Sequence, residues 1–207
     1  MNKEDIPSAL LSNAVSEFHK LPGIGSKTAL RLVLHILNQP ENEVKQFSDA
    51  LVQLKSQVKF CKSCNNISDT EICSICNNSS RKENLICVVE GIKDVMAIEK
   101  TMQYKGVYHV LGGIISPLDG IGPSDLSIDL LLNRLNKFKN GEIIFALPAT
   151  MEGDTTCFYI HKKIENKNIN FTTLSRGISI GDEIEYADEL TLGRSIVNRT
   201  AFEPSFR

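Results

Sequence analysis

Four cysteines lie within sixteen residues of this chain and constrain its local fold more than any other feature. Cys61 and Cys64 form one C-x2-C pair, and Cys73 and Cys76 form a second pair after an eight-residue gap. Each pair can form a tight turn that directs two thiolates at one point, so the two turns supply a tetrahedral zinc site. Four sulfurs leave no position for a substrate. The spacing therefore predicts a compact knuckle holding one structural Zn²⁺ per chain.

A pair of disulfides is the alternative interpretation of the same cysteines. Disulfides are typical of secreted chains, whereas the first residues of this chain contain no apolar signal core. No apolar run approaches the ~20 residues that a membrane helix needs. The two remaining cysteines, Cys87 and Cys157, lie in apolar surroundings, as is typical of buried and inert thiols. These features favour zinc over disulfides and predict a cytoplasmic protein without a membrane segment.

The segment from Leu21 to Lys27 reads Leu-Pro-Gly-Ile-Gly-Ser-Lys, the tight turn of a helix-hairpin-helix. Gly23 and Gly25 allow a sharp turn and a close approach to a partner. The helix that follows directs free N–H groups outward, which suits a phosphate. Lys27 and Arg31 are four residues apart and share one helix face with His35. The opposite, buried face is predicted to contain Leu30, Val33, Leu34 and Leu37.

The charge distribution supports a nucleic-acid contact at this hairpin. The net charge is −2, which argues against a uniformly basic binder. From His19 to Gln39, however, the chain has no Asp or Glu. An ordinary amphipathic helix with solvated lysines is the alternative. We favour contacts with the DNA backbone, which are independent of sequence and sensitive to salt. The expected DNA-binding residues are Lys20, Gly23, Gly25, Lys27 and Arg31.

Hydrophobic periodicity predicts two different architectures in the two parts of the chain. The first part contains three helices, at residues 8–18, 26–37 and 41–58, and the third has an apolar stripe of Val44, Phe47, Leu51 and Leu54. The second part alternates strands with helices, which implies a parallel sheet covered on both faces. The expected strands are residues 85–89, 106–111, 142–147 and 170–174, and the expected helices are 93–102, 124–139, 154–164 and 188–197.

The order of these parts resembles the RecR family of bacterial recombination proteins. After the hairpin and the four-cysteine knuckle, the similarity runs through Ile86–Glu99, Tyr108–Gly113, Ser116–Pro123 and Glu185–Leu192, and it covers essentially the whole chain. The resemblance implies an α/β protein of four parts, whose α/β part is a Toprim domain with a parallel sheet. The expected parts are a helix-hairpin-helix region (1–58), a four-cysteine zinc finger (59–80), the Toprim domain (81–175) and a C-terminal assembly segment (176–207).

Toprim enzymes hold Mg²⁺ with a glutamate at a strand end and an Asp-x-Asp pair on a later strand. Glu90 follows the first predicted strand, at the edge where open α/β sheets form sites. Alignment on Glu152-Gly153-Asp154 places Pro148 and Thr150 where the two aspartates would be. We therefore expect no productive metal site here. The sequence is interpreted instead as an acidic, partner-binding surface made by Glu90, Asp94, Glu152 and Asp154.

The family resemblance implies a function that composition alone does not. RecR-like proteins are non-enzymatic DNA clamps, form ring-like tetramers, and act with RecO and RecF to load RecA onto gapped single-stranded DNA in the nucleoid. Lys27 and Arg31 match the DNA-facing basic positions of the family. A Mg²⁺-dependent Toprim nuclease or primase using Glu90, Glu152 and Asp154 is the main alternative. A nucleotide-binding regulator acting through the loop 112–123 is a weaker one, because no Walker A motif is present.

Overall fold

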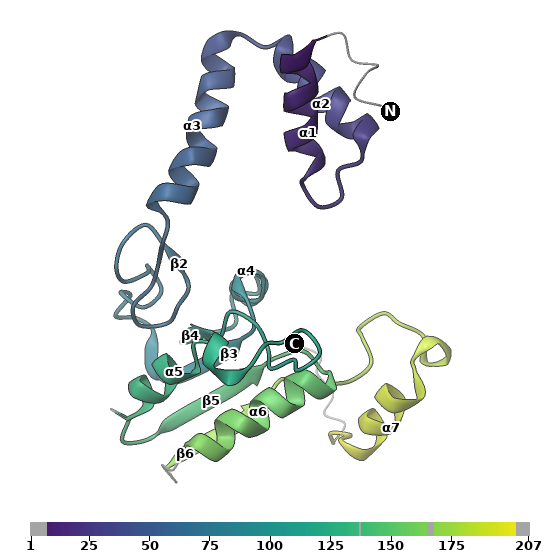
Figure 1. Cartoon of the computed structure of the whole chain (residues 1–207). Coiled ribbons are helices and arrows are strands. Elements are labelled where there is room, and N and C mark those ends of the chain that lie inside the picture. Colours follow the sequence, from purple (N-terminus) through teal and green to yellow (C-terminus); the bar gives the residue numbers. More distant parts are fainter. Residues whose placement is uncertain (1–7, 137, 165–167, 202–207) are drawn as a thin grey trace. The chain divides into compact units, whose positions relative to one another are not determined.

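The structure is a computed structural model that describes residues 8–136, 138–164 and 168–201. The chain divides into two compact units, residues 1–58 and residues 59–207 (Figure 1). Within the described ranges, no helix is both long enough and apolar enough to cross a lipid bilayer.

The first unit consists of helices α1 (Ala9–His19), α2 (Ser26–Leu37) and α3 (Glu41–Gln57). All three agree with the sequence prediction to within one residue. Ser8 caps α1 by accepting a hydrogen bond from the N–H of Leu11 (3.4 Å). Pro40 directly precedes α3, a favoured place for proline because a helix start needs no N–H donor. The signals that start α1 and α3 are therefore local to the sequence.

The apolar face of α2 is only partly buried. The sequence predicted a buried face of four residues, and the prediction was wrong at two of them. Val33 is buried with Val15 and Ala29, and Leu30 packs against this cluster. Leu34 and Leu37, in contrast, are exposed. Helix α3 has no buried residue at all, and its stripe of Phe47, Leu51 and Leu54 is open to solvent. In the described part of the first unit, α2 and α3 therefore leave several large apolar side chains exposed to solvent.

The second unit is built on a parallel sheet in the order β4-β3-β5-β6, as the alternating pattern predicted. Its strands are β3 (Lys82–Val89), β4 (Gly106–Val110), β5 (Gly141–Ala146) and β6 (Ile169–Thr173). The chain leaves β3 toward β4 on one side and leaves β5 toward β6 on the other. The adjacent carboxyl ends of β3 and β5 therefore form a topological switch point, the usual place for a site in an open α/β sheet.

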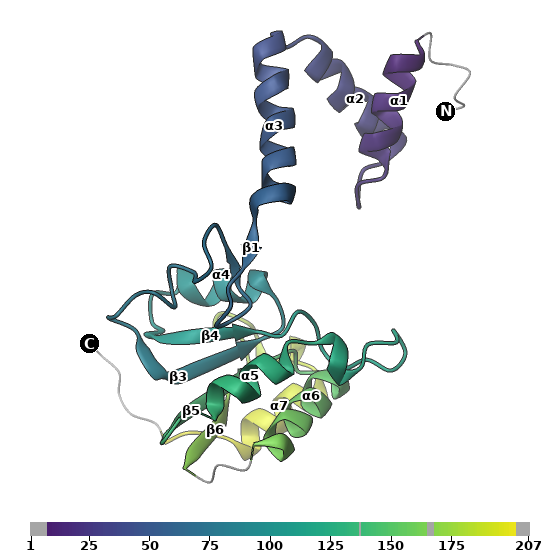
Figure 2. The same cartoon turned by 60° about the vertical axis from the view of Figure 1, so that its left-hand side comes forward.

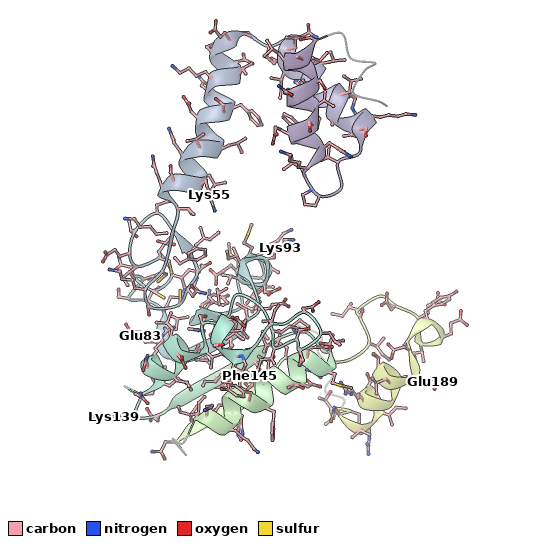
Figure 3. The ribbon with its side chains drawn as sticks, viewed as in Figure 1. Lys55, Glu83, Lys93, Lys139, Phe145 and Glu189 are labelled. Carbon is pink, nitrogen blue, oxygen red and sulfur yellow. The ribbon has the colours of Figure 1, made fainter. Side chains whose placement is uncertain are left out.

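Helices cover both faces of this sheet (Figures 1 and 2). Helices α5 (Ile128–Leu135) and α6 (Met151–Lys163) cover one face, over a core that includes Ile86, Ile143 and Ile160. Phe145 of β5 belongs to the same core (Figure 3). Helix α4 (Ile92–Lys100) covers the other face. This three-layer arrangement confirms the predicted fold class.

The helix expected at residues 124–139 is shorter and begins later. Pro123–Asp125 form the short 3-10 helix η2, and α5 starts only at Ile128. The carboxylate of Asp125 accepts the N–H of Gly122 (2.8 Å), which closes a local turn. Leu126 is buried in an extended conformation (φ −107°, ψ 156°), and this interrupts the helix. The extended residue Leu126 therefore separates η2 from α5, a break that the turn residues alone did not indicate.

Four further elements complete the described fold. Strands β1 (Lys59–Phe60) and β2 (Ile67–Ser68) pair antiparallel within the cysteine segment. The 3-10 helix η3 (Ile184–Tyr186) precedes α7 (Glu189–Val197). Asp188 caps α7 by accepting the N–H of Thr191 (2.9 Å), as expected from its position in the sequence.

Candidate functional site

The four cysteines of the two C-x2-C pairs come together in the second unit. Their sulfur atoms all lie within 4.8 Å of one another, and Cys61, Cys64 and Cys73 are buried. The Sγ atoms of Cys64 and Cys73 are 3.6 Å apart, far beyond the length of a disulfide bond. All six cysteines of the chain are free thiols. The structure thus favours the zinc interpretation over the disulfide one.

Local hydrogen bonds prepare these sulfurs to act as thiolates. The N–H of Cys73 donates to the Sγ of Cys61 (3.3 Å), and the N–H of Cys76 donates to the Sγ of Cys73 (3.4 Å). The hydrogen bond between Cys64 and Cys76 lowers the pKa of Cys76 and raises that of Cys64, and burial raises the pKa of Cys73. Zinc binds the deprotonated form of cysteine, so metal binding must release protons from this cluster. Four convergent sulfurs fit one tetrahedral Zn²⁺.

Backbone contacts attach the knuckle to the edge strand of the sheet. The N–H of Val110, at the end of β4, donates to the carbonyl of Cys64 (2.8 Å). The side-chain amide of Asn65 donates to the carbonyl of Val110 (3.0 Å). Asn65 has a positive φ of 59°, a conformation that asparagine tolerates better than most residues. The metal site therefore fixes a turn that continues the hydrogen bonding of β4.

In the first unit, the hairpin has the geometry of an anion site. Gly23 adopts φ 78°, which favours glycine, and the backbone of Gly25 forms the N-cap of α2. The ring Nδ1 of His19 lies 3.0 Å from the carbonyl of Ile24 and closes the turn. The first turn of α2 contains no acidic residue. Because Gly25 has no side chain to cap the helix, the first N–H groups of α2 can bind an external anion.

The predicted basic side chains of the hairpin are not equivalent. Lys27 and Arg31 are exposed on α2, one turn apart. Lys20 is also exposed, but its ammonium forms an ion pair with Glu17 (2.6 Å). Glu17 lies just before the carboxylate-free stretch, and this is why the sequence pattern did not indicate the pair. Lys27 and Arg31 are therefore the stronger candidates for phosphate contacts.

Glu90 and Asp94 line one pocket at the carboxyl end of β3 and β4. The pocket has a volume of about 520 Å³ and also contains Asn65 and Lys93. The carboxylate of Asp94 accepts the N–H of Gly91 (2.8 Å) and so caps α4. Glu90 is half-buried, and no partner is recorded for its carboxylate among the described residues. Asp94 therefore caps α4, whereas the Glu90 carboxylate makes no such contact among the described residues.

Glu152 and Asp154 lie in the first turn of α6 and do not line that pocket. Asp154 forms a two-point ion pair with Arg176 (2.7 and 3.3 Å), which lowers the pKa of its carboxyl. Sequence analysis missed Arg176, because twenty-two residues separate it from Asp154. Thr150, at the position of a Toprim aspartate, caps α6 by accepting the N–H of Gly153 (3.2 Å). In the described ranges, only the four cysteines form a cluster suited to a metal.

Comparison with known proteins agrees with this order of parts. Four family models match the chain, and each covers a different segment. They are the RecR helix-hairpin-helix (residues 11–55), the RecR four-cysteine zinc finger domain (58–78), the Toprim domain (84–175) and the RecR C-terminal domain (177–200). The zinc finger model covers all four cysteines of the cluster, which supports one zinc ion at this site.

Curated relatives named Recombination protein RecR match almost the whole chain. The protein of Bacteroides thetaiotaomicron is 58% identical over 202 residues, with 98% of each chain covered. That of Parabacteroides distasonis is 60% identical over 196 residues, with 95% of this chain and 94% of the relative covered. That of Flavobacterium johnsoniae is 57% identical over 203 residues, with 98% of each covered. Identity of this extent, together with the zinc, hairpin and Toprim geometry, shows that the chain belongs to the RecR family.

Proposed function

We propose that this protein acts in recombinational DNA repair as a non-enzymatic DNA-binding clamp. In this role it works with RecO and RecF to load RecA onto gapped single-stranded DNA. The observation that carries the proposal is the hairpin, where Lys27 and Arg31 stand beside the open N-terminus of α2. Guanidinium, ammonium and free backbone N–H groups all bind phosphate. The relatives' shared name as recombination proteins supports the same role.

A clamp accounts for the low overall charge of a protein that contacts DNA. With a net charge of −2, one subunit offers few phosphate contacts. Several subunits in a ring multiply those contacts, and encirclement of the strand keeps them near their target. The exposed apolar residues of α3 are consistent with contacts between subunits. We propose a homo-oligomer, from a dimer to a ring tetramer, with the C-terminal segment 176–207 contributing to assembly.

The hairpin assignment is tested by replacing Lys27 and Arg31 with alanine in one variant. We expect much weaker binding of single-stranded and gapped DNA, because two phosphate contacts are lost. Each lost contact should also reduce the magnitude of the slope of log K against log salt by about 0.7–0.9. The matched control replaces Lys162 and Lys163, which are exposed at the end of α6, and so removes the same charge without changing α3. Fluorescence anisotropy over a range of salt concentrations measures both. Equal binding by the two variants would refute the assignment of this face.

The competing hypothesis is a Mg²⁺-dependent nuclease or primase that uses Glu90. Thr150 is occupied in capping α6 and Pro148 has no carboxylate, which counts against a bound metal at this edge. We expect no cleavage or synthesis when the protein is incubated with DNA, nucleotides and Mg²⁺ or Mn²⁺. Turnover that disappears in Glu90→Ala would establish the enzyme and reject the clamp as a complete description.

The acidic residues are proposed to bind a basic surface of RecO or RecF. Glu90 and Glu152 carry the proposal best, because Asp94 and Asp154 already have partners within the chain. A Glu90→Gln variant is expected to weaken binding of RecO or RecF in surface plasmon resonance and to leave DNA affinity unchanged. Glu83→Gln, on the exposed start of β3, is the matched control.

A further inference from the structure

A second polar pocket lies at the carboxyl end of β6. It has a volume of about 490 Å³ and is formed by the end of β6, the first turn of α6 and the last turns of α7. The residues that line it are Asp154, Thr173, Leu174, Ser175, Arg176, Arg194 and Asn198. These residues come from segments far apart in the sequence. The pocket is therefore a product of the fold and belongs neither to the zinc knuckle nor to the hairpin.

The charges in this pocket do not cancel. Arg176 pairs with the one carboxylate among the lining residues, that of Asp154. Arg194 is half-buried, and no hydrogen bond or ion pair is recorded for its guanidinium among the described residues. The positive charge of Arg194 nevertheless contributes to the lowered pKa of Asp154, which places the two groups near each other. The pocket thus keeps one uncompensated positive charge in a partly enclosed space.

The remaining donors suit an oxyanion with several oxygen atoms. The Arg176 guanidinium has five N–H donors and uses two of them on Asp154. Ser175 and Thr173 add hydroxyl groups, and Asn198 adds an amide. Phosphate accepts hydrogen bonds from guanidinium groups in a fork geometry that a single surface lysine does not offer. None of the lining residues is aromatic, so the pocket offers no ring on which a base could stack.

We propose that this pocket binds a phosphate group of a DNA strand, with Arg194 as the principal contact and Arg176 as the second. The proposal rests on the proposed DNA-binding function and adds a contact in the second unit to the one at the hairpin. A bound phosphodiester neutralises Arg194 without disturbing the Arg176–Asp154 pair. Contacts of this kind are independent of base sequence.

The first test is a footprint on the full-length, zinc-loaded protein. Phenylglyoxal modifies accessible arginines, and peptide mass spectrometry reports each site. We expect an oligothymidylate to protect both Arg31 and Arg194, while Arg199 stays reactive. Arg199 is exposed beyond the pocket, and its guanidinium donates to the carbonyl of Ile196 (3.1 Å). A parallel arm replaces the oligonucleotide with inorganic phosphate. Protection of Arg194 by inorganic phosphate, without protection by the oligonucleotide, would overturn DNA as the source of the phosphate.

The second test compares Arg194→Gln with Arg199→Gln in DNA binding. Loss of one contact to single-stranded DNA should lower affinity about five-fold at 0.1 M salt and reduce the salt slope by about 0.7. The Arg199 variant should match the parent protein. Light scattering on the same samples shows whether assembly is intact, and the footprint does not depend on any variant.

The outcomes separate this proposal from the proposed function. If Arg31 is protected while Arg194 stays reactive and Arg194→Gln binds like the parent, the second site is refuted and DNA binding at the hairpin stands. If neither arginine is protected and no DNA is bound, the proposed function fails together with the second site.

Discussion

At the scale of single residues, a half-buried ion pair joins α4 to the sheet. The guanidinium of Arg81 donates two hydrogen bonds to the carboxylate of Glu99, one of them at 2.8 Å, and a third to the carbonyl of Gly106 (3.2 Å). The hydroxyl of Tyr108 donates to Glu99 as well (2.7 Å). The carboxylate of Glu99 on α4 is therefore tied both to Tyr108 of β4 and to Arg81, the residue just before β3.

Glu99→Gln tests this network and its dependence on pH. The hydrogen bond from Arg81 holds the pKa of Glu99 below its ordinary value of 4.5. A carboxyl whose pKa is lowered by folding stabilises the protein above that ordinary value, and the contribution is lost as the pH falls through the lowered pKa. At neutral pH we expect the variant to lose about 1–3 kcal/mol in free energy of unfolding.

Urea unfolding at neutral pH and at acid pH measures the effect. The difference between Glu99→Gln and the parent should shrink in acid, since Glu99 itself becomes protonated there. Glu83→Gln, whose side chain is exposed on β3 (Figure 3), should be close to neutral at both pH values. A difference that persists unchanged below the lowered pKa would show that the network does not act through the charge of Glu99.

Residue roles were predictable from the sequence only where the partners are close in the chain. The cysteines could be assigned because each C-x2-C turn is local, and the assembled cluster follows from two such turns. The pairing of Asp154 with Arg176 and of Arg81 with Glu99 depends on sheet register, which the sequence does not display. Lys20 forms an ion pair with Glu17, which makes it less available to DNA. The sequence argument considered only the stretch from His19 to Gln39 and so did not include Glu17.

At the scale of elements, two helical glycines predict opposite effects of the same substitution. A Cβ atom at Gly153 in α6 would lie 2.0 Å from the carbonyl oxygen of Pro148, which is backbone and cannot rotate away. At Gly193 in α7, nothing lies within 4 Å of such a Cβ. Alanine also has the higher helix propensity. At Gly153 the steric conflict should outweigh the gain in helix propensity, whereas at Gly193 only the gain in helix propensity remains.

We therefore expect Gly153→Ala to lower the free energy of unfolding by about 1–3 kcal/mol and Gly193→Ala to raise it by up to about 1 kcal/mol. Each variant serves as the control for the other in thermal or urea unfolding. A stabilised Gly153→Ala would mean that the turn from Pro148 to Gly153 can relax.

Zinc removal is the second prediction at this scale. We expect one zinc per chain by elemental analysis, and a chelator should destabilise the second unit because the knuckle hydrogen bonds to Val110 of β4. Cys61→Ser should lose the metal, whereas Cys157→Ser, outside the cluster, should retain it. Metal affinity should fall as the pH falls, since protons compete for the thiolates. Substoichiometric zinc together with oxidised cysteine pairs would refute the site.

Element type was predictable for the long helices and the four strands of the parallel sheet, and the element ends were predictable where a capping signal is local. Helix α7 begins at its Asp188 cap as expected. Helix α6 begins three residues earlier than predicted, because its N-cap is Thr150. Strand β3 extends back to Lys82, over exposed residues that show no apolar pattern and pair with β4 only across an irregular register.

At the scale of the whole molecule, the apolar stripe of α3 is exposed within the described part of the first unit. The apolar residues of α3 repeat at helical spacing, as in a helix that packs against a partner. None of the seventeen residues of α3 is buried. The predicted apolar stripe is thus present on helix α3. No other element in the described part of the first unit buries it. The proposed homo-oligomer would resolve this mismatch.

The final prediction concerns this stripe. Phe47→Ser combined with Leu51→Ser should reduce the molar mass found by light scattering by at least one assembly step, since apolar burial at α3 would no longer favour association. The control is Leu118→Ser, which removes an exposed leucine from a loop of the second unit. Because Lys27 and Arg31 remain, the double variant should keep its contact with DNA but lose affinity through reduced multivalency. An unchanged mass would refute α3 as a subunit contact, and a lower mass with undiminished DNA affinity would refute the argument that a ring compensates for the low charge of each subunit.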